Sequence, residues 1–523
     1  MLQTQIVTII ALVIFAAAMV GIGIYSWRKT QTIDGFLLGG RNIGAWVSAF
    51  AYGTSYFSAV VFVGYAGQHG WNIGLGGIWI GIGNALLGCL LAWQLLAKRT
   101  KVMTTTLAAK TMPEFFEKRY NSTAIKIFAA VIIFVFLVPY SAAVYKGLSS
   151  MFSAIFPGVP NNVWLLIIAV LTAFYLVLGG YVATAYTDFV QGTIMIVGVF
   201  AMVIAIVNTD AVGGFGNLMS NLAAIPDNGD GITGAQLTSW YGGSSLKFLC
   251  VNILLTSFGT WGLPQMVSKY YAIKDIKAVK QAKVISTVFA LIIGCGAYFV
   301  GSLSRLVLNN QLPEGGVDSV IPQTLLTALG DPNIVTTIIL AVILILLLSA
   351  SMSTLSSIVL SSASAISVDL IPEVKKNYNP KNQMLITRVL CLVFVALSYV
   401  FATTNITIIV NIMSFSWGIV SGCFIGPYVW GIYSKKVTKA AAWAGMIAGF
   451  LTVAVTTVIL TCMNMGAAES VYAAFKMAAS KAPEMGCAAM AVSLIVTPVV
   501  SLFTPKFSKE HLETVFETAY TKN

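Results

Sequence analysis

Charged residues are scarce in this chain, since they make up only 9% of its 523 residues. Soluble domains carry about 25% charged residues, so a soluble protein of ordinary composition is excluded. Hydrophobic residues account for 58% of the chain, which instead predicts an all-α protein that crosses a membrane many times. No stretch between the apolar runs is long enough to form a large soluble domain.

Histidine is scarcer still, with two residues, and no HExxH, GxSxG or P-loop motif occurs. Without such groups we expect a protein that is not an enzyme. The seven cysteines lie mostly within apolar runs and show no CxxC spacing, which is typical of small core residues. Cys462 and Cys487 are predicted near the same membrane face, and the sequence does not decide whether they pair.

Apolar runs long enough to span a bilayer recur along the chain, and they predict about thirteen transmembrane helices. The runs cover residues 5–26, 44–67, 72–98, 123–155, 161–181, 185–208, 244–266, 282–308, 333–366, 385–403, 407–432, 438–462 and 485–504. The first run lacks the basic stretch and the cleavage site of a signal peptide, so we expect it to be retained as a helix.

The net charge of +12 would indicate nucleic acid as a partner if the protein were soluble. Here lysine and arginine gather in every second loop, for example at 98–126, 269–283 and 435–439, while the opposite loops are acidic or neutral. Cytoplasmic loops of membrane proteins show this excess. We therefore expect a plasma-membrane protein with its N-terminus outside and its C-terminus in the cytoplasm. Its expected partners are the bilayer and small molecules, with no nucleic acid and no obligate protein partner.

One apolar run gathers hydroxyl groups on a single helix face. Ala350, Ser353, Thr354 and Ser357 recur at i, i+3, i+4 and i+7. Neutral oxygens inside a membrane can replace the water shell of a small cation. Serine and threonine in spanning helices also pack against neighbouring helices or bond to the carbonyl four residues back, and the spacing alone favours this second interpretation.

Two predicted spans contain residues that interrupt helices. The span at 44–67 has the flexible Gly53 beside several hydroxyl residues, and the span at 244–266 contains Gly259 and Pro264. The interruptions lie five spans apart. Because five is odd, two five-span units would have opposite orientations, which is the inverted repeat of secondary transporters. Kinked but continuous helices are the alternative.

Few ionisable residues fall inside the predicted spans. Asp188 begins the span at 185–208, where it is either a functional acid or a first-turn acid that the helix dipole favours. Lys146, in the span at 123–155, is expected to reach the membrane surface or to pair. A proton pump usually needs a chain of buried carboxylates or histidines. No such chain is present in the sequence, which favours coupling to a metal cation.

Several stretches resemble the sodium/solute symporter family, most closely its sodium/proline branch. They are Phe36–Gly44, Gly179–Gln191, Ala350–Ser357, Gly426 with Pro427, and Ala444–Gly449. The pattern Gly-Gly…Thr-Asp-x-x-Gln combined with Ala-x-Met-Ser-Thr-Leu-Ser is specific. The resemblance implies a LeuT-like transporter of about thirteen helices, with a five-plus-five inverted-repeat core and alternating access.

The resemblance also implies a domain organisation. A peripheral first helix and a cytoplasmic loop (1–43) precede the first repeat (44–208), an extracellular loop (209–243), the second repeat (244–432), two peripheral spans (433–504) and a cytoplasmic tail (505–523).

A sodium site between the spans at 44–67 and 333–366 follows from the same resemblance. Its implied ligands are the carbonyls of Thr54, Phe57 and Ala350 and the hydroxyls of Ser353 and Thr354. Some family members bind a second sodium ion nearer the cytoplasm. The matching residues here are Ser353, Ser356, Ser357 and Asp188. The number of sodium ions per transport cycle, one or two, remains open, and we favour two.

The solute side departs from the proline branch, because Tyr56 stands where that branch has an acid. The candidate solute-binding residues are Ser55, Tyr56, Ser58, Tyr140, Thr256, Thr260, Trp261, Ser414 and Trp417. Hydroxyl groups and aromatic rings fit a small organic solute, either an amino acid such as proline or a small carboxylate. The predicted function is sodium-coupled symport of such a solute. A transporter-like solute sensor and a facilitator without ion coupling are the alternatives.

Overall fold

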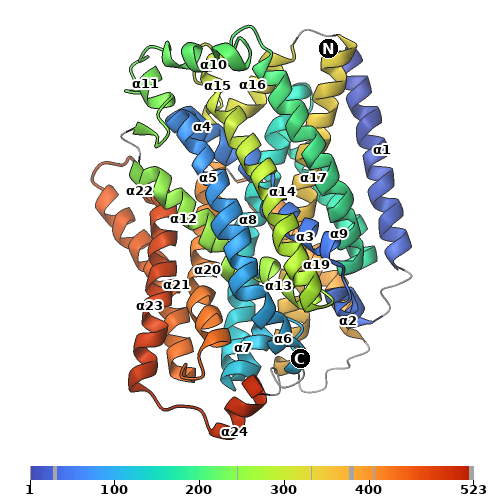
Figure 1. Cartoon of the computed structure of the whole chain (residues 1–523), viewed down its shortest axis with the longest axis vertical. Coiled ribbons are helices and arrows are strands. Elements are labelled where there is room, and N and C mark those ends of the chain that lie inside the picture. The colour runs from blue at the N-terminus through green and yellow to red at the C-terminus, as the bar shows by residue number, and fades with distance from the viewer. Residues whose placement is uncertain are drawn as a thin grey trace.

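The protein is a bundle of helices that run mostly along the longest axis of the molecule (Figure 1). The computed structural model describes residues 2–27, 32–243, 246–330, 333–375, 382–404 and 407–517. Within these ranges no strand occurs, and a single parallel bridge joins Ile43 to Ile273. The predicted all-α fold is thereby confirmed. Helix α1 begins at the end of the molecule opposite to α24 (Figure 1).

The long helices account for most of the bundle. They are α1 (Leu2–Trp27), α8 (Thr123–Ile155), α9 (Asn161–Val207), α14 (Ile276–Ser302), α17 (Ile334–Ser364), α19 (Gln383–Ala402), α20 (Ile409–Tyr433), α21 (Lys439–Asn464) and α23 (Ala482–Phe503). Within α9, Gly180 has φ +52° and ψ −148°, so the chain turns there between two helical halves. The sequence predicts this division, since it separates the spans at 161–181 and 185–208.

Residues 45–106 form a series of shorter helical segments. They are α3 (Ala45–Tyr56), η2 (Val60–Tyr65), α4 (Ala66–Ile73), η3 (Gly74–Gly77), α5 (Ile78–Gly83), η4 (Asn84–Leu91), η5 (Trp93–Ala97) and α6 (Lys98–Thr106). Gly74, with φ +55°, sits against the backbone of Leu237, where no Cβ would fit. A second broken pair consists of α12 (Leu246–Gly262) and α13 (Pro264–Ala272), which are bent by 51°.

Short helices cap the two ends of the bundle. They are α2 (Ile33–Leu38), η1 (Gly39–Arg41), α7 (Met112–Tyr120), α10 (Gly214–Ala223), α11 (Gly234–Leu237), α15 (Ser304–Val307), η7 (Gly316–Ser319), α16 (Val320–Ala328), η8 (Ala365–Leu370), α18 (Ile371–Val374), α22 (Val471–Ala479), α24 (Lys509–Leu512) and η10 (Glu513–Glu517). In Figure 1, α10 and α11 lie at one end of the molecule, and α6, α7 and α24 lie at the other.

The number of spans differs from the prediction. Among the described residues, ten helices are long and apolar enough to cross a membrane, or eleven if α12 and α13 form one bent span. The predicted number of about thirteen is not confirmed. The break after α3 leaves only 12 residues in that helix, and the first half of α9 counts only as a shorter apolar helix over Asn161–Phe174.

Burial separates the central helices from the peripheral ones. In α20, 94% of the most apolar window is buried, compared with 22% in α1 and in α21. Helix α17 packs against α9, α8, α1 and α3, so it is surrounded in the middle of the bundle. Its hydroxyl face therefore meets protein and not lipid.

Candidate ion and solute site

The interruption predicted at Gly53–Ser58 is a true break. Helix α3 ends at Tyr56, and Phe57 is extended with φ −102° and ψ 108°. A Cβ at Gly53 would collide with the ring of Phe289 in α14, so close packing against α14 requires glycine at this position. The alternative of a kinked but continuous helix is wrong here.

The break diverts backbone donors that a continuous helix would use internally. In an uninterrupted helix, the Ala59 N–H would donate to the Ser55 carbonyl. Here it donates to the Ser351 hydroxyl of α17 at 3.3 Å, and the Val60 N–H donates to the Ser58 hydroxyl at 3.2 Å. The break therefore leaves carbonyl oxygens near its end without their usual helical donors.

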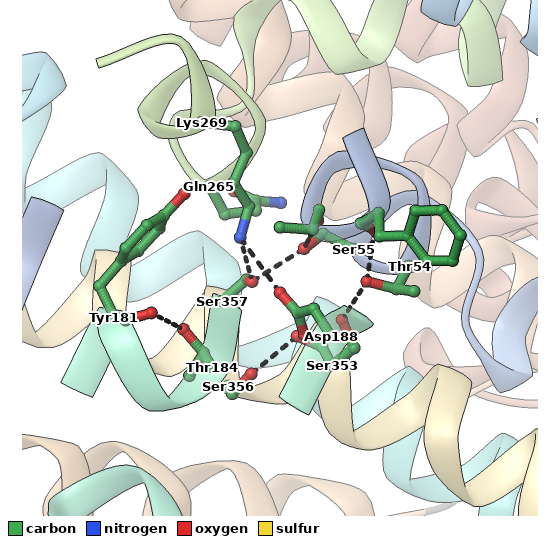
Figure 2. A network of polar contacts seen from close by, with 12 residues as sticks. Thr54, Ser55, Tyr181, Thr184, Asp188, Gln265, Lys269, Ser353, Ser356 and Ser357 are labelled. Atoms are coloured by element: carbon green, nitrogen blue, oxygen red, sulfur yellow. Dashed lines mark hydrogen bonds and ion pairs between the residues drawn. The ribbon is translucent and has the colours of Figure 1, made fainter. Parts of the chain in front are cut away.

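The hydroxyl face of α17 lies against these carbonyl oxygens. The Thr354 Oγ1 is 3.2 Å from the Thr54 carbonyl oxygen, 3.4 Å from that of Ser55 and 3.0 Å from that of Ala350. The Ser353 hydroxyl donates to the Thr54 hydroxyl at 2.7 Å (Figure 2). All five residues are buried.

One side-chain proton faces three carbonyl oxygens in this arrangement. A threonine hydroxyl carries one proton, so Thr354 satisfies one of its three carbonyl neighbours at a time. Unwound backbone carbonyls of this kind coordinate sodium in transporters with broken helices. The described residues contain no group of three or more His, Cys, Asp or Glu side chains able to hold a metal ion. The oxygen set fits a small monovalent cation held by neutral ligands.

Phe57, the remaining residue of the first predicted sodium set, caps α3, and its ring stacks on Tyr56 with centroids 4.8 Å apart. The residues of the second predicted set lie beside the first. The Ser356 hydroxyl donates to the Ser353 carbonyl at 2.8 Å, and the Ser357 hydroxyl lies 2.9 Å from that of Ser55.

Asp188 has a partner that the sequence interpretation missed. The Lys269 Nζ lies 3.7 Å from Asp188 Oδ2 and donates to the Ser357 hydroxyl at 3.0 Å (Figure 2). Both charged side chains are fully buried. The sequence predicts Lys269 in a cytoplasmic loop, because the apolar run ends near residue 266. Pro264 could have indicated this placement, because proline favours the first position of a helix. It begins α13, the helix that carries Lys269 into the bundle.

Four of the predicted solute residues gather around one aromatic cluster. Trp417 of α20 makes an edge-to-face contact with Tyr140 at 5.6 Å between centroids and lies 6.4 Å from the ring of Tyr56. The Tyr56 hydroxyl donates to the Thr256 carbonyl at 2.7 Å. The Trp417 Nε1 is buried and has no hydrogen-bond partner. Gly259, which the sequence predicts as part of an interruption, lies within the continuous helix α12 and lets it approach this indole.

The other predicted solute residues have different surroundings. The Trp261 Nε1 donates to the Leu87 carbonyl of η4 at 3.1 Å, and the Thr260 hydroxyl donates to the Ser257 carbonyl at 2.8 Å. The Ser414 hydroxyl lies 3.0 Å from that of Tyr65. Ser55 faces Ser357, and the Ser58 hydroxyl accepts from the N–H of Val60, the first residue of η2. Trp261 therefore bonds to η4 and is not part of the aromatic cluster around Trp417.

A small cavity of about 30 Å³ reaches the charged pair. Its lining includes Lys110 and Thr111 from the segment that joins α6 to α7, and also Lys269 and Ser357. The cavity thus lies between the segment that joins α6 to α7 and the polar network.

Comparison with known proteins places this arrangement in context. The model of the sodium:solute symporter family matches residues 36–449. The osmoregulated proline transporter OpuE of Bacillus subtilis (strain 168) is 28% identical over 450 residues, which cover 85% of this chain and 87% of that protein. The sodium/proline symporter of Escherichia coli (strain K12) is 27% identical over 456 residues, which cover 84% and 86%.

Solved structures show the same fold. A Na⁺-coupled sialic acid symporter in a substrate-bound, outward-open state matches with a TM-score of 0.73 and 17% identity. The match covers 96% of this chain and 99% of that one. The predicted LeuT-like transporter fold is confirmed.

Proposed function

Since the chain belongs to the sodium:solute symporter family and is a sodium-coupled symporter of a small organic solute, we propose that sodium binds where the break after α3 meets α17. The protein is a multi-pass membrane transporter and not an enzyme. The observation that carries the proposal is the single Thr354 hydroxyl facing the carbonyls of Thr54, Ser55 and Ala350.

In this proposal, the ion brings positive charge to the oxygen atoms that gather beside the break. It is held by the carbonyls of Thr54, Phe57 and Ala350 and by the hydroxyls of Ser353 and Thr354. Binding joins α3 to α17 and so favours one arrangement of the two helices over the other. Coupling is reciprocal, so sodium tightens solute binding by the factor by which solute tightens sodium binding.

The matched variants Thr354→Val and Ser362→Ala test the site. Thr354→Val keeps the side-chain shape and removes the hydroxyl, so we expect the sodium concentration for half-maximal thermal stabilisation to rise about tenfold, the equivalent of one lost hydrogen bond of about 1.4 kcal/mol. Ser362 is a buried serine of the same helix whose hydroxyl has no hydrogen-bond partner, and its variant should leave that concentration unchanged. Equal sodium dependence in both variants contradicts the site.

We propose that the solute is a small carboxylate bound at the aromatic cluster of Tyr56, Tyr140 and Trp417. The unpartnered Trp417 N–H is a donor for an anionic oxygen, and the neighbouring sodium ion adds positive charge. Tyr56 stands where the proline branch has an acid, so a carboxylate partner for a solute ammonium group is missing at that position. An amino acid such as proline is the alternative, which the proline transporters among the relatives favour.

A thermal-shift screen decides between the two solutes. A ligand at a hundred times its dissociation constant stabilises a protein by about 2.7 kcal/mol. We expect short monocarboxylates to raise the Tm of the purified protein in sodium and to lose that effect in potassium. Stabilisation by proline alone would overturn the carboxylate and leave the sodium site standing.

We propose that the end of the bundle with α6 and α7 faces the cytoplasm, with the N-terminus outside. The excess of lysine and arginine at that end supports this orientation. Cys462 is exposed and lies near the opposite end, and both it and Cys487 are free. A membrane-impermeant maleimide should therefore label intact cells more strongly than cells with the Cys462→Ser variant. Labelling of Cys462 only after lysis would reverse the orientation.

A further inference from the structure

We propose that Lys269 is a built-in cation that fills the place of a second sodium ion, so that each transport cycle uses one sodium. The family resemblance favours two ions, with Asp188 as the anionic ligand of the second. This inference rests on the proposed function in one respect, namely that the single sodium ion binds at the break after α3.

The first argument is the position of the ammonium group. The Lys269 Nζ lies 3.7 Å from Asp188 Oδ2 and donates to the Ser357 hydroxyl at 3.0 Å. Asp188 and Ser357 belong to the predicted second sodium set, and the ammonium group contacts both. Ser357 in turn lies 2.9 Å from the Ser55 hydroxyl, so the lysine is linked to the broken helix itself (Figure 2).

The second argument is charge. Asp188 and Lys269 are both fully buried, and a buried carboxylate is stable only when it is paired or bound to a metal. Within the described part of the chain, Lys269 supplies the one ion pair that Asp188 makes. A sodium ion on the same carboxylate would lie a few ångströms from the ammonium group, and the two positive charges would repel each other.

The third argument is how the lysine is held. Besides its contacts with Asp188 and Ser357, its Nζ lies 5.1 Å from the centre of the Tyr181 ring, within the range of a cation–π contact. The cavity beside the segment that joins α6 to α7 is lined by Lys269 and Ser357, while Asp188 is not part of its lining. An ion that entered by this route would therefore meet a fixed positive charge before it reached Asp188.

Equilibrium binding of radiolabelled sodium to the purified full chain tests the inference. We expect the wild type to bind one ion per chain at saturation, and Lys269→Met, which frees Asp188, to bind two. Lys269→Arg keeps the charge and should bind one. The double variant Asp188→Asn with Lys269→Met removes both charges and should also return to one.

Two outcomes overturn the inference. The first is two ions bound to the wild type, which decides the matter even if Lys269→Met does not fold. The second is one ion bound to a folded Lys269→Met protein. Failure of the proposed sodium site would give a different result. Thr354→Val would then bind as many sodium ions as the wild type and with the same affinity, both with lysine and with methionine at position 269.

Discussion

At the scale of single residues, the two sites differ in what the side chains supply to the oxygen atoms around them. Thr354 has one proton for three carbonyl neighbours, while Lys269 brings its own charge to Asp188. The spacing of residues 350–357 predicts the hydroxyl face correctly, because a helix in the middle of a bundle keeps its period. The Lys269–Asp188 pair is missed, because it joins two helices 81 positions apart that no local pattern connects.

Asp318 gives a residue-scale prediction outside the membrane spans. Its carboxylate accepts from the Ile409 N–H at 3.1 Å, at the start of α20. Burial raises the pKa of Asp318 from 3.8 to about 6, although the Ile409 N–H and Lys146 oppose the shift. A raised folded-state pKa means that protonation stabilises the fold. This contribution is fully present below about pH 4 and is lost as the pH rises through about 6.

The variant Asp318→Asn should therefore mimic the protonated side chain. We expect its Tm to match that of the wild type near pH 4 and to exceed it at pH 8, because the amide has no charge to bury. Asp210→Asn, which removes an exposed carboxylate, is the matched control and should show no such pH-dependent gain. A Tm of Asp318→Asn below that of the wild type at pH 8 would contradict the assignment.

At the scale of helices, the break after α3 depends on a serine that is not a predicted ligand. The Ser351 hydroxyl accepts from the Ala59 N–H at 3.3 Å, which keeps that donor from the Ser55 carbonyl. The sequence predicts that the helix is interrupted, since Gly53 and its hydroxyl neighbours weaken it. The partner that holds the break open lies on α17, 292 positions away, and only the folded chain shows it.

Ser351→Ala tests this role. Without its acceptor, the buried Ala59 N–H must return to Ser55 or stay unsatisfied, at a cost of about 1–3 kcal/mol. We expect the sodium concentration for half-maximal stabilisation to rise by at least about fivefold, about 1 kcal/mol. Ser349→Ala removes a neighbouring buried hydroxyl that has no hydrogen-bond partner and should have no such effect. If the two variants behave alike, Ser351 does not support the break.

The sequence does not predict how α12 is rotated about its own axis, and this limits the prediction of the solute residues. Helix α12 has no strongly polar face, so its apolar pattern does not indicate which residues meet α20 and which meet η4. Tyr56, Tyr140 and Trp417 come together as expected. Trp261 instead bonds to η4, and Gly259 is the residue through which α12 packs closely against the Trp417 ring.

At the scale of the whole molecule, the two ends of the bundle differ. At the end with α6 and α7, a small cavity borders the polar network, whereas the larger hollow at the opposite end is lined by Arg305 and residues of the loops there and not by that network. Toward the opposite end, the Tyr65 and Ser414 hydroxyls lie 3.0 Å apart, and Arg305 pairs with Asp230 at 2.6 Å. A transporter that works by alternating access needs such a difference between its ends, because an ion site open to both sides would dissipate the sodium gradient.

The central claim is that sodium binds between the broken helix α3 and the hydroxyl face of α17. An experimental structure of the full chain at saturating sodium tests it most directly, with a sodium-free structure for comparison. We predict ion density in contact with the carbonyls of Thr54 and Ala350 and with the hydroxyls of Ser353 and Thr354. Density for sodium elsewhere, with the Ser353–Thr54 hydrogen bond of 2.7 Å intact, would contradict the account.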